Sequence, residues 1–377
     1  MKIWIIGRGY PTTENRNWGS FEFEQAKLLS ENGYEVVYIA LTLSFFDRKD
    51  PRGYREFTDD KVSVFTYSHF YFPGKTGIYL ETYEDKCWGD LFRRAETKSG
   101  VPNIIHVHYP TMLSSINQIE KYRKRGSRIF VTEHWSRVLI GNLRKHELKR
   151  LTYYAKNSSC FACVGSGLRE AVINLVNDKP PLILIPNVVS PFFFQMRDNN
   201  KPNSDEFTFV AIGRLVGLKQ FDCIIKQFNK VFNDNHKVRL KIIGTGNERK
   251  KLEKIAGNNN RIEFTGNLDL QGVAEELSLS DALVSFSKYE TFCVPVTEAW
   301  ALGKPVIVSD KSGVASYVND DNGIVVRCDS EEDLGNALLN IIMNYGNYQK
   351  GNIISFAEDH FSGKAVVNLL DEMYKCY

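Results

Sequence analysis

Short apolar runs recur along the whole chain, and stretches with helical periodicity separate them. The first series comprises "KIWII", "EVVYIAL", "KVSVFTY", "NIIHVHY", "RIFVTE", "CFACVG" and "LILIP", and the second comprises "FTFVAIG", "VRLKIIG", "RIEFTG", "ALVSFS", "PVIVSD" and "GIVV". Continuous apolar runs that alternate with helices are typical of parallel sheets covered by helices on both faces. Each series therefore predicts one open α/β domain.

The segment between the two series predicts the domain boundary. At 377 residues the chain is long enough for two or three domains. The second half of "NVVSPFFFQMRDNNKPNSDEF" is polar and aperiodic, as linkers are. We therefore expect an N-terminal domain over residues 1–187, a linker over 188–205 and a C-terminal domain over 206–355.

The final segment, residues 356–377, predicts a helix that has no strand of its own. Its apolar positions share one helical face: Val366, Leu369, Leu370 and Met373. Because no strand follows this helix, it must pack on a domain that is already formed.

Composition excludes several classes of protein. The net charge of +3 gives no reason to expect nucleic acid as a partner. The seven cysteines are mostly isolated, which predicts a reduced, cytoplasmic protein, and the one C-x-x-C, "CFAC", lies in an apolar run that predicts a structural strand. No apolar run approaches the roughly 18 residues of a membrane span. The opening "MKIWIIGRGYP" predicts a first strand rather than a signal peptide.

In open parallel sheets, ligands bind beyond the carboxyl ends of the strands, where loops lead into helices. The first such loop, in "IIGRGYPTTENRNWGSFEFEQ", contains Gly7 and Gly9 but has Thr12 where a dinucleotide fingerprint needs glycine. The loop is also too long for that tight turn, which disfavours nicotinamide binding. Gly19 lies at the expected helix start, where backbone N–H groups could approach a phosphate.

The loop in "FVAIGRLVGLKQFDCII" places two cations at a strand-to-helix turn. Arg214 and Lys219 lie on either side of this short loop. Two cations beside helix N–H groups suit a diphosphate. Exposed cations that contact nothing would produce the same pattern, so both interpretations stay open.

Two further strand-to-helix loops are weaker candidates. Gly244 and Gly246, in "LKIIGTGNERKKLE", suit a tight turn better than a ligand contact. Asn267 and Leu268, in "IEFTGNL", follow another strand at a place where a nucleotide base could lie.

The stretch "SKYETFCVPVTEAW" places Glu290 and Glu298 on either side of Pro295. Because proline favours the first turn of a helix, we expect the helix to begin near Pro295 with Glu298 in its first turn. The amides that would then point at an anion are those of Phe292, Cys293 and Val294. The Glu298 carboxylate could accept hydrogen bonds from the two hydroxyls of a ribose. Taken alone, a glutamate that complements the helix dipole is the simpler interpretation.

Three histidines lie near the ends of expected strands. His106 and His108 share one face of "NIIHVHY", and His134 follows "RIFVTE". No third ligand stands at a recognisable spacing from the pair, so a structural role is favoured over a metal site. For His134, a cleft position and a structural role stay equally open.

Taken together, these segments resemble the retaining glycosyltransferases of family 4, which have the GT-B fold. The E-x-F-G-x-x-x-x-E segment of that family is similar to "ETFCVPVTE", and its G-R-L…K-G-F-D segment is similar to "GRLVGLKQFD". The segments "GYPTTENRNWGSFEFEQAKLL", "KIIGTGNERKKLE" and "LIPNVVSPFFF" also resemble family segments in the right order. The resemblance covers nearly the whole chain and is more specific in its C-terminal half.

The resemblance implies two Rossmann-like domains that face a central cleft, with the final helix crossing back to the N-terminal domain. It implies retaining transfer of a hexose-type sugar from a nucleotide-diphosphate sugar to a glycan or lipid-linked acceptor. No metal and no other cofactor is expected. The implied role is the synthesis of a surface polysaccharide or glycoconjugate.

The resemblance also assigns roles to residues of the C-terminal half. Glu298 matches the glutamate that binds the donor ribose, and Glu290 matches the one beside the donor sugar. Arg214 and Lys219 match the cations that bind the diphosphate. The loop that faces the sugar and the phosphates is matched by the amides of Phe292, Cys293 and Val294.

In the N-terminal half, Gly19 matches a glycine near the diphosphate, and His134 matches a cleft histidine near the transferred sugar. Three positions depart from the family pattern. Cys293 and Gln220 stand where glycine is usual, and "PNVV" lacks the usual glycine-aspartate. None of these departures removes a charged group, so we expect an active enzyme with a shifted donor preference.

The acceptor and the reaction class leave alternatives. The basic stretches "KYRKRGSR" and "NLRKHELKR" suit peripheral contact with anionic lipid or with a lipid-diphosphate acceptor, or they are solvated helix faces. A nucleotide-sugar epimerase of the same fold and a non-catalytic nucleotide-sugar-binding protein remain rivals. A glycoside hydrolase that pairs Glu290 with Glu298 would leave the phosphate-suited loops unexplained.

Overall fold

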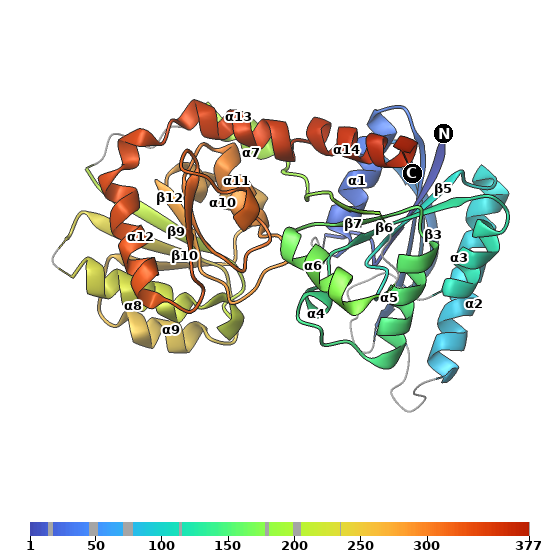
Figure 1. Ribbon diagram of the computed structural model, residues 1–377, viewed down its shortest axis with the longest axis horizontal. Helices are drawn as coiled ribbons and strands as arrows, with labels where there is room; N and C mark the ends of the chain where they lie inside the picture. The colour runs from blue at the N-terminus through green and yellow to red at the C-terminus, as the bar shows by residue number, and fades with distance from the viewer. Residues whose placement is uncertain are drawn as a thin grey trace. The chain divides into compact units, whose positions relative to one another are not determined.

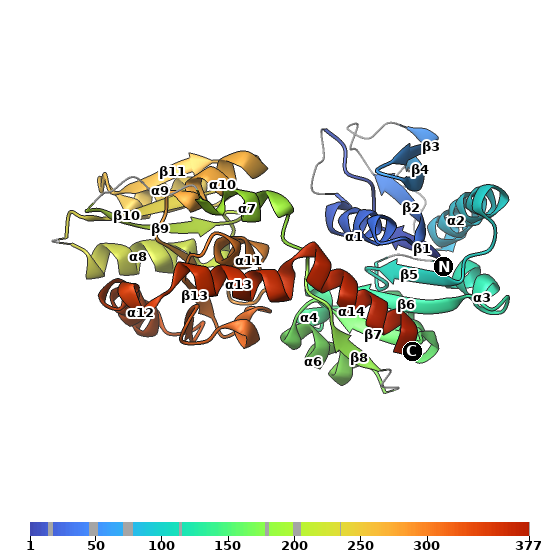
Figure 2. The same cartoon turned by 90° about the horizontal axis from the view of Figure 1, so that it is seen from above.

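A computed structural model describes residues 1–13, 18–44, 52–70, 78–112, 115–177, 181–198, 205–233 and 235–376. The chain forms two compact units. Unit 1 comprises Met1–Val188 together with Val366–Tyr377, and unit 2 comprises Val189–Ala365. Each unit is a sheet with helices on both faces (Figures 1 and 2).

Unit 1 is built on a sheet whose strand order is β3-β4-β2-β1-β5-β6-β7-β8. Only the β3–β4 pair is antiparallel, and the other neighbours run parallel. The strands are β1 (Lys2–Gly7), β2 (Glu35–Ser44), β3 (Gly53–Asp59), β4 (Val62–Phe70), β5 (Ile104–His108), β6 (Arg128–Glu133), β7 (Cys160–Cys163) and β8 (Leu182–Leu184).

Strand β3 is the one strand that the apolar runs did not predict. Its sequence, GYREFTD, alternates between half-buried and exposed positions. Such alternation is expected for an antiparallel edge strand with one face in water, whereas continuous apolar runs mark strands that are buried on both faces.

The helices of unit 1 cover both faces of its sheet. Their bounds are α1 (Ser20–Glu31), α2 (Ile78–Ser99), α3 (Ile116–Arg123), α4 (Ser136–Leu139), α5 (Lys145–Asn157), α6 (Ser166–Leu175) and α14 (Gly363–Cys376). On one face α1 and α14 share a core with the strands. On the other face the Trp4 ring lies 5.6 Å from Phe92 of α2 and 5.0 Å from Tyr122 of α3.

The C-terminal helix α14 packs on unit 1, as its apolar face predicted. Val366, Leu370, Met373 and Tyr374 are all buried there. The Tyr374 hydroxyl is 2.6 Å from Nδ1 of His106 on β5, which ties the helix to the middle of the sheet. The helix therefore completes the core of a domain whose other part ends at Val188.

Unit 2 has an all-parallel sheet with the order β11-β10-β9-β12-β13-β14. The strands are β9 (Phe207–Ile212), β10 (Val238–Ile243), β11 (Ile262–Gly266), β12 (Ala282–Ser285), β13 (Val306–Ser309) and β14 (Gly323–Val326). The α-helices are α7 (Pro191–Gln195), α8 (Phe221–Val231), α9 (Arg249–Ala256), α10 (Leu270–Ser278), α11 (Val294–Ala301), α12 (Glu331–Met343) and α13 (Lys350–Phe361). Short 3₁₀ turns include η1 (Met196–Asp198) and η2 (Gly217–Lys219).

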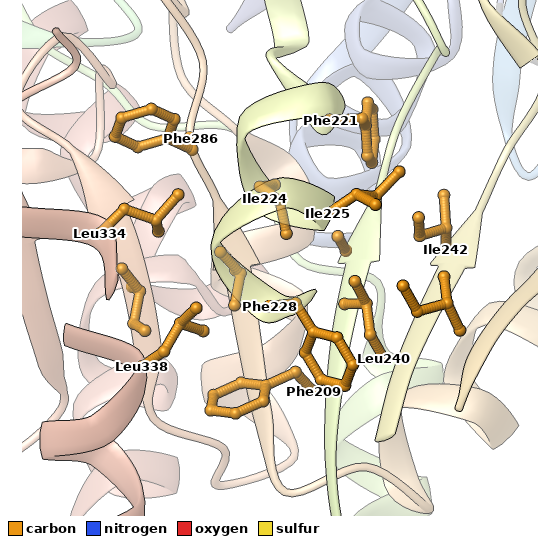
Figure 3. Packing of buried hydrophobic residues seen from close by; sticks show 14 of the residues in the cluster. Phe209, Phe221, Ile224, Ile225, Phe228, Leu240, Ile242, Phe286, Leu334 and Leu338 are labelled. Atoms are coloured by element: carbon orange, nitrogen blue, oxygen red, sulfur yellow. The ribbon is translucent and has the colours of Figure 1, made fainter. Parts of the chain in front are cut away.

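Helix α8 shows how the apolar pattern produces the core of unit 2. Its side chains at i, i+3, i+4, i+7 and i+11 are at most 3% exposed: Phe221, Ile224, Ile225, Phe228 and Phe232. Figure 3 shows this face of α8 pointing at Phe209 and Leu240 of the sheet and at Leu334 and Leu338 of α12. The same stripe thus holds the helix on the sheet and fixes where its N-terminus lies.

The structure also shows what occupies the segments predicted as domain boundaries. Residues 191–198 of the expected linker form α7 and η1, and residues 199–204 lie outside the described part of the chain. The expected final helix over 356–377 is two helices, since α13 runs to Phe361 and α14 begins at Gly363. Among the described residues, the helices are all too short or too polar to cross a bilayer.

Candidate active site in the C-terminal unit

The strand order of unit 2 indicates where a ligand would bind. Strand β9 is the first strand of the sheet in sequence, and it pairs with β10 on one side and β12 on the other. The chain therefore leaves in opposite directions from the carboxyl ends of β9 and β12. In open α/β sheets such a switch point opens a crevice between two loops. Here these loops are residues 213–220 and 286–293.

Lys219 and Glu290 join the two loops. The Lys219 ammonium forms an ion pair with the Glu290 carboxylate, and the two side chains are 18% and 21% exposed. A hydrogen bond of 2.9 Å from the Lys288 amide to the Leu218 carbonyl also joins the loops. Burial lowers the pKa of Lys219, but the charge of Glu290, its hydrogen bond and the Cys293 thiol together raise the pKa above its usual value, so the ammonium stays charged.

Gly213 begins the loop after β9 and lies beside the Lys219 side chain. Its φ of 155° lies at the edge of the region that glycine adopts most easily, and a Cβ there would lie 3.7 Å from Cε of Lys219. Arg214 follows directly and is exposed, and its charge lowers the pKa of Lys219. Among the described residues no carboxylate is within ion-pair distance of Arg214. The loop after β9 thus holds one cation that is paired and one that is available to an anion.

The N-terminus of α11 adds unsatisfied backbone donors. The helix begins at Val294, and within the described chain no acceptor contacts the N–H groups of Phe292, Cys293 or Val294. The backbone of Gly313 packs closely against this loop. A Cβ on Gly313 would lie 2.0 Å from the Thr291 carbonyl oxygen, so only glycine fits there. Free N–H groups at a helix start attract anions.

Cys293 has the backbone conformation that favours glycine. Its φ is 91° and its ψ is 72°, and it caps α11. This explains why the family pattern that the loop resembles has glycine there. The side chain is buried, with its sulfur 3.3 Å from Oγ of Ser285. Burial, and next the charge of Glu290, raise the pKa of this thiol to about 11, so it stays protonated at neutral pH.

Glu298 does not lie in the first helical turn, contrary to the sequence expectation. Because α11 begins at Val294, Glu298 is its fifth residue, in the second turn. The helix dipole acts mainly within the first turn, so the dipole interpretation loses support. Burial raises the pKa of Glu298 to about 8, and within the described residues its carboxyl has no partner. A half-buried carboxyl without a partner is costly to keep unless a ligand uses it.

Gln220 is a site residue whose role the sequence did not reveal. It caps α8 with a φ of 50°, and its side-chain amide donates to the carbonyls of Phe286 (2.9 Å) and Cys328 (3.0 Å). The glutamine therefore ties α8 to the loops after β12 and β14. No sequence signal identifies this role, because the partners are backbone atoms distant in sequence.

The remaining predicted residues of unit 2 lie elsewhere at the same edge of the sheet. Asn267 and Leu268 follow β11, which is two strands away from β9. Gly244 and Gly246 pack against backbone, since a Cβ on either would lie within 2.2 Å of a carbonyl oxygen of the β9 loop. Close packing of the backbone accounts for both glycines.

Unit 1 holds the other two predicted residues, Gly19 and His134. Gly19 caps α1 with a φ of 79°, and a Cβ there would lie 2.1 Å from the carbonyl oxygen of Gly9. That carbonyl accepts a 2.6 Å hydrogen bond from the hydroxyl of Tyr38. Glycine is therefore required at position 19 by the backbone alone, whether or not a phosphate binds.

His134 ends a row of three buried histidines. Its Nε2 is 3.1 Å from Nδ1 of His108, whose ring stacks on His106 at 4.4 Å. The second ring nitrogens of His134 and His108 are buried without a protein partner in the described chain. Burial lowers the pKa of all three rings, so they are neutral at pH 7.

A buried ion pair near His134 was not predicted from the sequence. Arg8 lies 3.3 Å from the fully buried Glu22. Its guanidinium stacks on Tyr109 at 4.2 Å, and the Tyr109 ring stacks on His134 at 4.7 Å. Both Arg8 and Glu22 follow ordinary helix and strand patterns, so only the fold reveals that they meet.

Two further predictions concern cysteines and metals. Cys160 and Cys163 of "CFAC" are fully buried in β7 as free thiols, in agreement with a structural strand. Among the described residues no cluster of three or more histidine, cysteine, aspartate or glutamate side chains could hold a metal ion.

Residues 192–353, nearly all of unit 2, match the family described as glycosyl transferases group 1. The chain carries a glycosyltransferase domain. An uncharacterized glycosyltransferase of Methanocaldococcus jannaschii is 22% identical over 317 residues, which are 73% of this chain and 80% of that relative. The domain and the named glycosyltransferase relatives support transferase activity.

Solved structures show the same fold for this glycosyltransferase. Sucrose-phosphate synthase from Thermosynechococcus elongatus aligns with a TM-score of 0.75 at 17% identity, over 100% of this chain and 98% of its own. Anabaena HepE in complex with UDP and glucose aligns with a TM-score of 0.68 at 15% identity, over the whole of both chains. The fold is GT-B, as expected from the sequence.

Proposed function

We propose that this chain is a retaining, metal-independent glycosyltransferase that moves a hexose-type sugar from a nucleotide-diphosphate sugar to a glycan or lipid-linked acceptor. The observation that carries the proposal is the switch point of unit 2. There the loop that carries Arg214 and Lys219 is joined, through the Lys219–Glu290 ion pair, to the loop whose unbonded amides begin α11. Such a position suits a diphosphate.

The same residues would supply the chemistry of transfer. As the bond from the sugar C1 to the diphosphate oxygen breaks, negative charge grows on the diphosphate. Arg214, Lys219 and the helix amides stabilise that charge, which lowers the barrier. The new bond forms between C1 and an acceptor oxygen on the same face of the sugar, and the acceptor's hydroxyl proton passes to the departing phosphate oxygen.

In this proposal Glu290 and Glu298 hold opposite ends of one donor. Glu290 is already paired with Lys219, so it would position that cation and contact the sugar hydroxyls. Glu298 has no partner in the described chain and would accept hydrogen bonds from the ribose. These roles differ from an acid/base pair, in which one carboxyl must give up a proton at the reacting bond.

His134 would act as a neutral hydrogen-bonding group. Burial lowers its pKa well below 6.5, so the ring is neutral at pH 7 and cannot act as an imidazolium acid. Its contact with His108 fixes the plane of the ring and leaves Nδ1 free of protein partners in the described chain. A sugar hydroxyl would supply the missing hydrogen bond.

Cys293 would set part of the donor preference. Its side chain points to Ser285 and fills space next to the Lys219–Glu290 pair, where a glycine would leave a gap. A donor sugar must fit beside that side chain. We therefore expect Cys293→Gly to accept bulkier sugar substituents than the natural enzyme accepts.

We place this activity in the cytoplasm, in the synthesis of a surface polysaccharide or glycoconjugate. All seven cysteines are free, which suits a reducing compartment. Peripheral contact with a membrane surface belongs to the same proposal, because lipid-linked acceptors are presented there.

A thermal-shift panel tests the proposal with UDP, GDP, ADP and their sugars. A ligand at a hundred times its dissociation constant stabilises the protein by roughly 2.7 kcal/mol. UDP and UDP-glucose come first, because the HepE structure contains UDP. If no nucleotide raises the melting temperature, the proposal is wrong. Product analysis then separates the reaction classes, since an epimerase converts the donor without an acceptor.

A further inference from the structure

His108 and His134 lie at the carboxyl ends of neighbouring strands in unit 1. His108 is the last residue of β5, and His134 follows directly after β6, which pairs with β5 in parallel. Figure 2 shows the two strands side by side. The side chains are 0% and 6% exposed, and Nδ1 of His108 is 3.1 Å from Nε2 of His134. The sheet therefore brings the two rings into one buried hydrogen bond.

This contact constrains the tautomers of both rings. Burial lowers the pKa of the two histidines, to about 3 for His108, so each ring is neutral at pH 7. A neutral imidazole carries one N–H and one bare nitrogen, so one of the two facing nitrogens must donate to the other. If Nδ1 of His108 donates, His134 holds its hydrogen on Nδ1. If Nε2 of His134 donates, His108 holds its hydrogen on Nε2. The contact therefore gives both rings the same tautomer, either Nδ1–H or Nε2–H.

The two remaining ring nitrogens decide between these tautomers. Nε2 of His108 and Nδ1 of His134 are both buried without a protein partner in the described part of the chain. In the Nε2–H tautomer His108 would bury an N–H group that nothing accepts, whereas in the Nδ1–H tautomer it buries a bare nitrogen. Buried backbone N–H groups are left unpaired less often than buried acceptors, and an unpaired ring N–H has the same kind of cost. The Nδ1–H tautomer is therefore favoured in both rings.

Other neighbours hold the backbone and the ring faces of His134 and His108. The buried carboxylate of Glu133 accepts hydrogen bonds from the backbone N–H groups of His134 (2.9 Å) and Trp135 (3.0 Å). The Tyr109 ring stacks on His134 at 4.7 Å, and the His106 ring stacks on His108 at 4.4 Å. Among the described residues, His108 is the one side chain that forms a hydrogen bond with the His134 ring. The tautomer of His134 thus depends on His108.

We propose that His108 is a positioning residue that fixes His134 in the Nδ1–H tautomer, so that His134 presents an N–H donor to an oxygen atom of the transferred sugar. The sugar in this inference rests on the proposed function, whereas the tautomer does not depend on any ligand. A ring held in this way can donate without turning or moving its hydrogen when the sugar binds. A sugar that lacks the oxygen atom would leave the Nδ1–H unpaired and would therefore be a poorer substrate.

Nuclear magnetic resonance on the full chain without ligand tests the tautomer directly. The seven histidines are labelled with ¹⁵N, and long-range ¹H–¹⁵N spectra are recorded at pH 7. A protonated and a bare ring nitrogen have well separated ¹⁵N shifts, and spectra of H108N and H134N assign the signals. We expect Nδ1–H in both His108 and His134. Free histidine prefers the Nε2–H tautomer, so this result would not arise without the contact between the rings.

Two substitutions at position 108 separate its hydrogen bond from its stacking on His106. H108F keeps an aromatic ring against His106 but cannot donate to His134, whereas H108N loses the ring but has a side-chain amide that can donate from near the place of Nδ1. We expect H108F to lower turnover of the donor, measured as release of the nucleoside diphosphate, by roughly tenfold or more. H108N should keep most of the turnover. His134 should stay Nδ1–H in H108N and change towards Nε2–H in H108F.

The matched control is Tyr374→Phe, which removes a hydrogen bond to His106 in the same core but leaves the contact between His108 and His134 intact. It should lower stability without changing turnover or either tautomer. Binding of the nucleoside diphosphate, measured by calorimetry, should be the same in all variants, because the residues proposed to bind it lie in unit 2. Circular dichroism checks that each variant is folded.

Several results would overturn the proposal. These are Nε2–H or a mixture of tautomers at His134 in the natural chain, turnover in H108F equal to that of the natural chain, or equal losses of turnover in H108F and H108N. A chain that binds no nucleotide would refute the proposed function instead. In that case the spectra still decide whether His108 fixes the tautomer of His134.

Discussion

Substitution of Glu298 by glutamine tests the donor site through its pH dependence. A ribose donates hydrogen bonds most strongly to an ionised carboxylate, so binding should favour the charged form of Glu298. Burial raises the pKa of this group to about 8 in the free protein. Binding therefore pulls the pKa down and releases a proton, which means that affinity is full above the free pKa and falls as the pH drops below it.

The size of the effect follows from the ionised fraction. With a pKa of about 8, that fraction is about 1% at pH 6 and about 90% at pH 9, a change of about 90-fold or roughly 2.7 kcal/mol. Glu298→Gln keeps the shape and one acceptor but cannot ionise. The ratio of natural to variant affinity should thus rise about tenfold per pH unit below pH 8 and level off above it.

Isothermal titration calorimetry with UDP-glucose, or with whichever nucleotide sugar the thermal-shift panel selects, measures this ratio from pH 6 to pH 9. Titrations of the ligand and of other protein groups cancel, because both proteins share them. Heats measured in two buffers report the released proton directly. A ratio that changes by less than threefold over this range would show that Glu298 does not bind the ribose as an ionised carboxylate.

Three further substitutions test other parts of the structure. Lys219→Ala should lower kcat by about a hundredfold or more, which is the usual cost of removing one donor that stabilises a developing anion. Lys226→Ala, on the outside of α8, should leave kcat unchanged. Equal effects of the two variants in steady-state kinetics would contradict the site. Gln220→Gly should lower the free energy of unfolding in urea by about 1 kcal/mol. The loss of two hydrogen bonds outweighs the backbone strain that glycine relieves at a φ of 50°. A stabilised variant would disprove this. Tyr374→Phe leaves a buried nitrogen of His106 unpaired and should cost about 1–3 kcal/mol; an unchanged unfolding midpoint would show that α14 does not need this bond.

The predictability of the candidate site follows the range of the interactions. Arg214, Lys219 and Glu290 were found because each follows a strand that the apolar pattern locates, and strand ends meet at one edge of a parallel sheet. Asn267 and Leu268 follow a strand by the same pattern and lie two strands from β9 at the same edge of the sheet, so their place near a nucleotide base stays a prediction.

Other features depend on contacts that no local pattern encodes. Gln220 bonds two carbonyls that are 66 and 108 residues away in sequence. The ion pair of Arg8 with the buried Glu22 forms only when α1 packs on β1. The two basic stretches look alike in sequence, but the Glu96 that pairs with Arg125 lies on α2, 29 residues away. This pairing is therefore invisible before folding.

The sequence by itself determined the class of each domain, the positions of thirteen of the strands and the face by which the last helix packs. These features depend on burial along one strand or one helix, and hydrophobic periodicity records burial residue by residue. Tertiary structure alone decided the strand order, the start of α11 that moves Glu298 into its second turn, and the positive φ that makes Cys293 unusual. It also decided which surface cations are paired with distant acids, such as Arg125 with Glu96. Each of these depends on a partner distant in the chain, and only packing selects that partner.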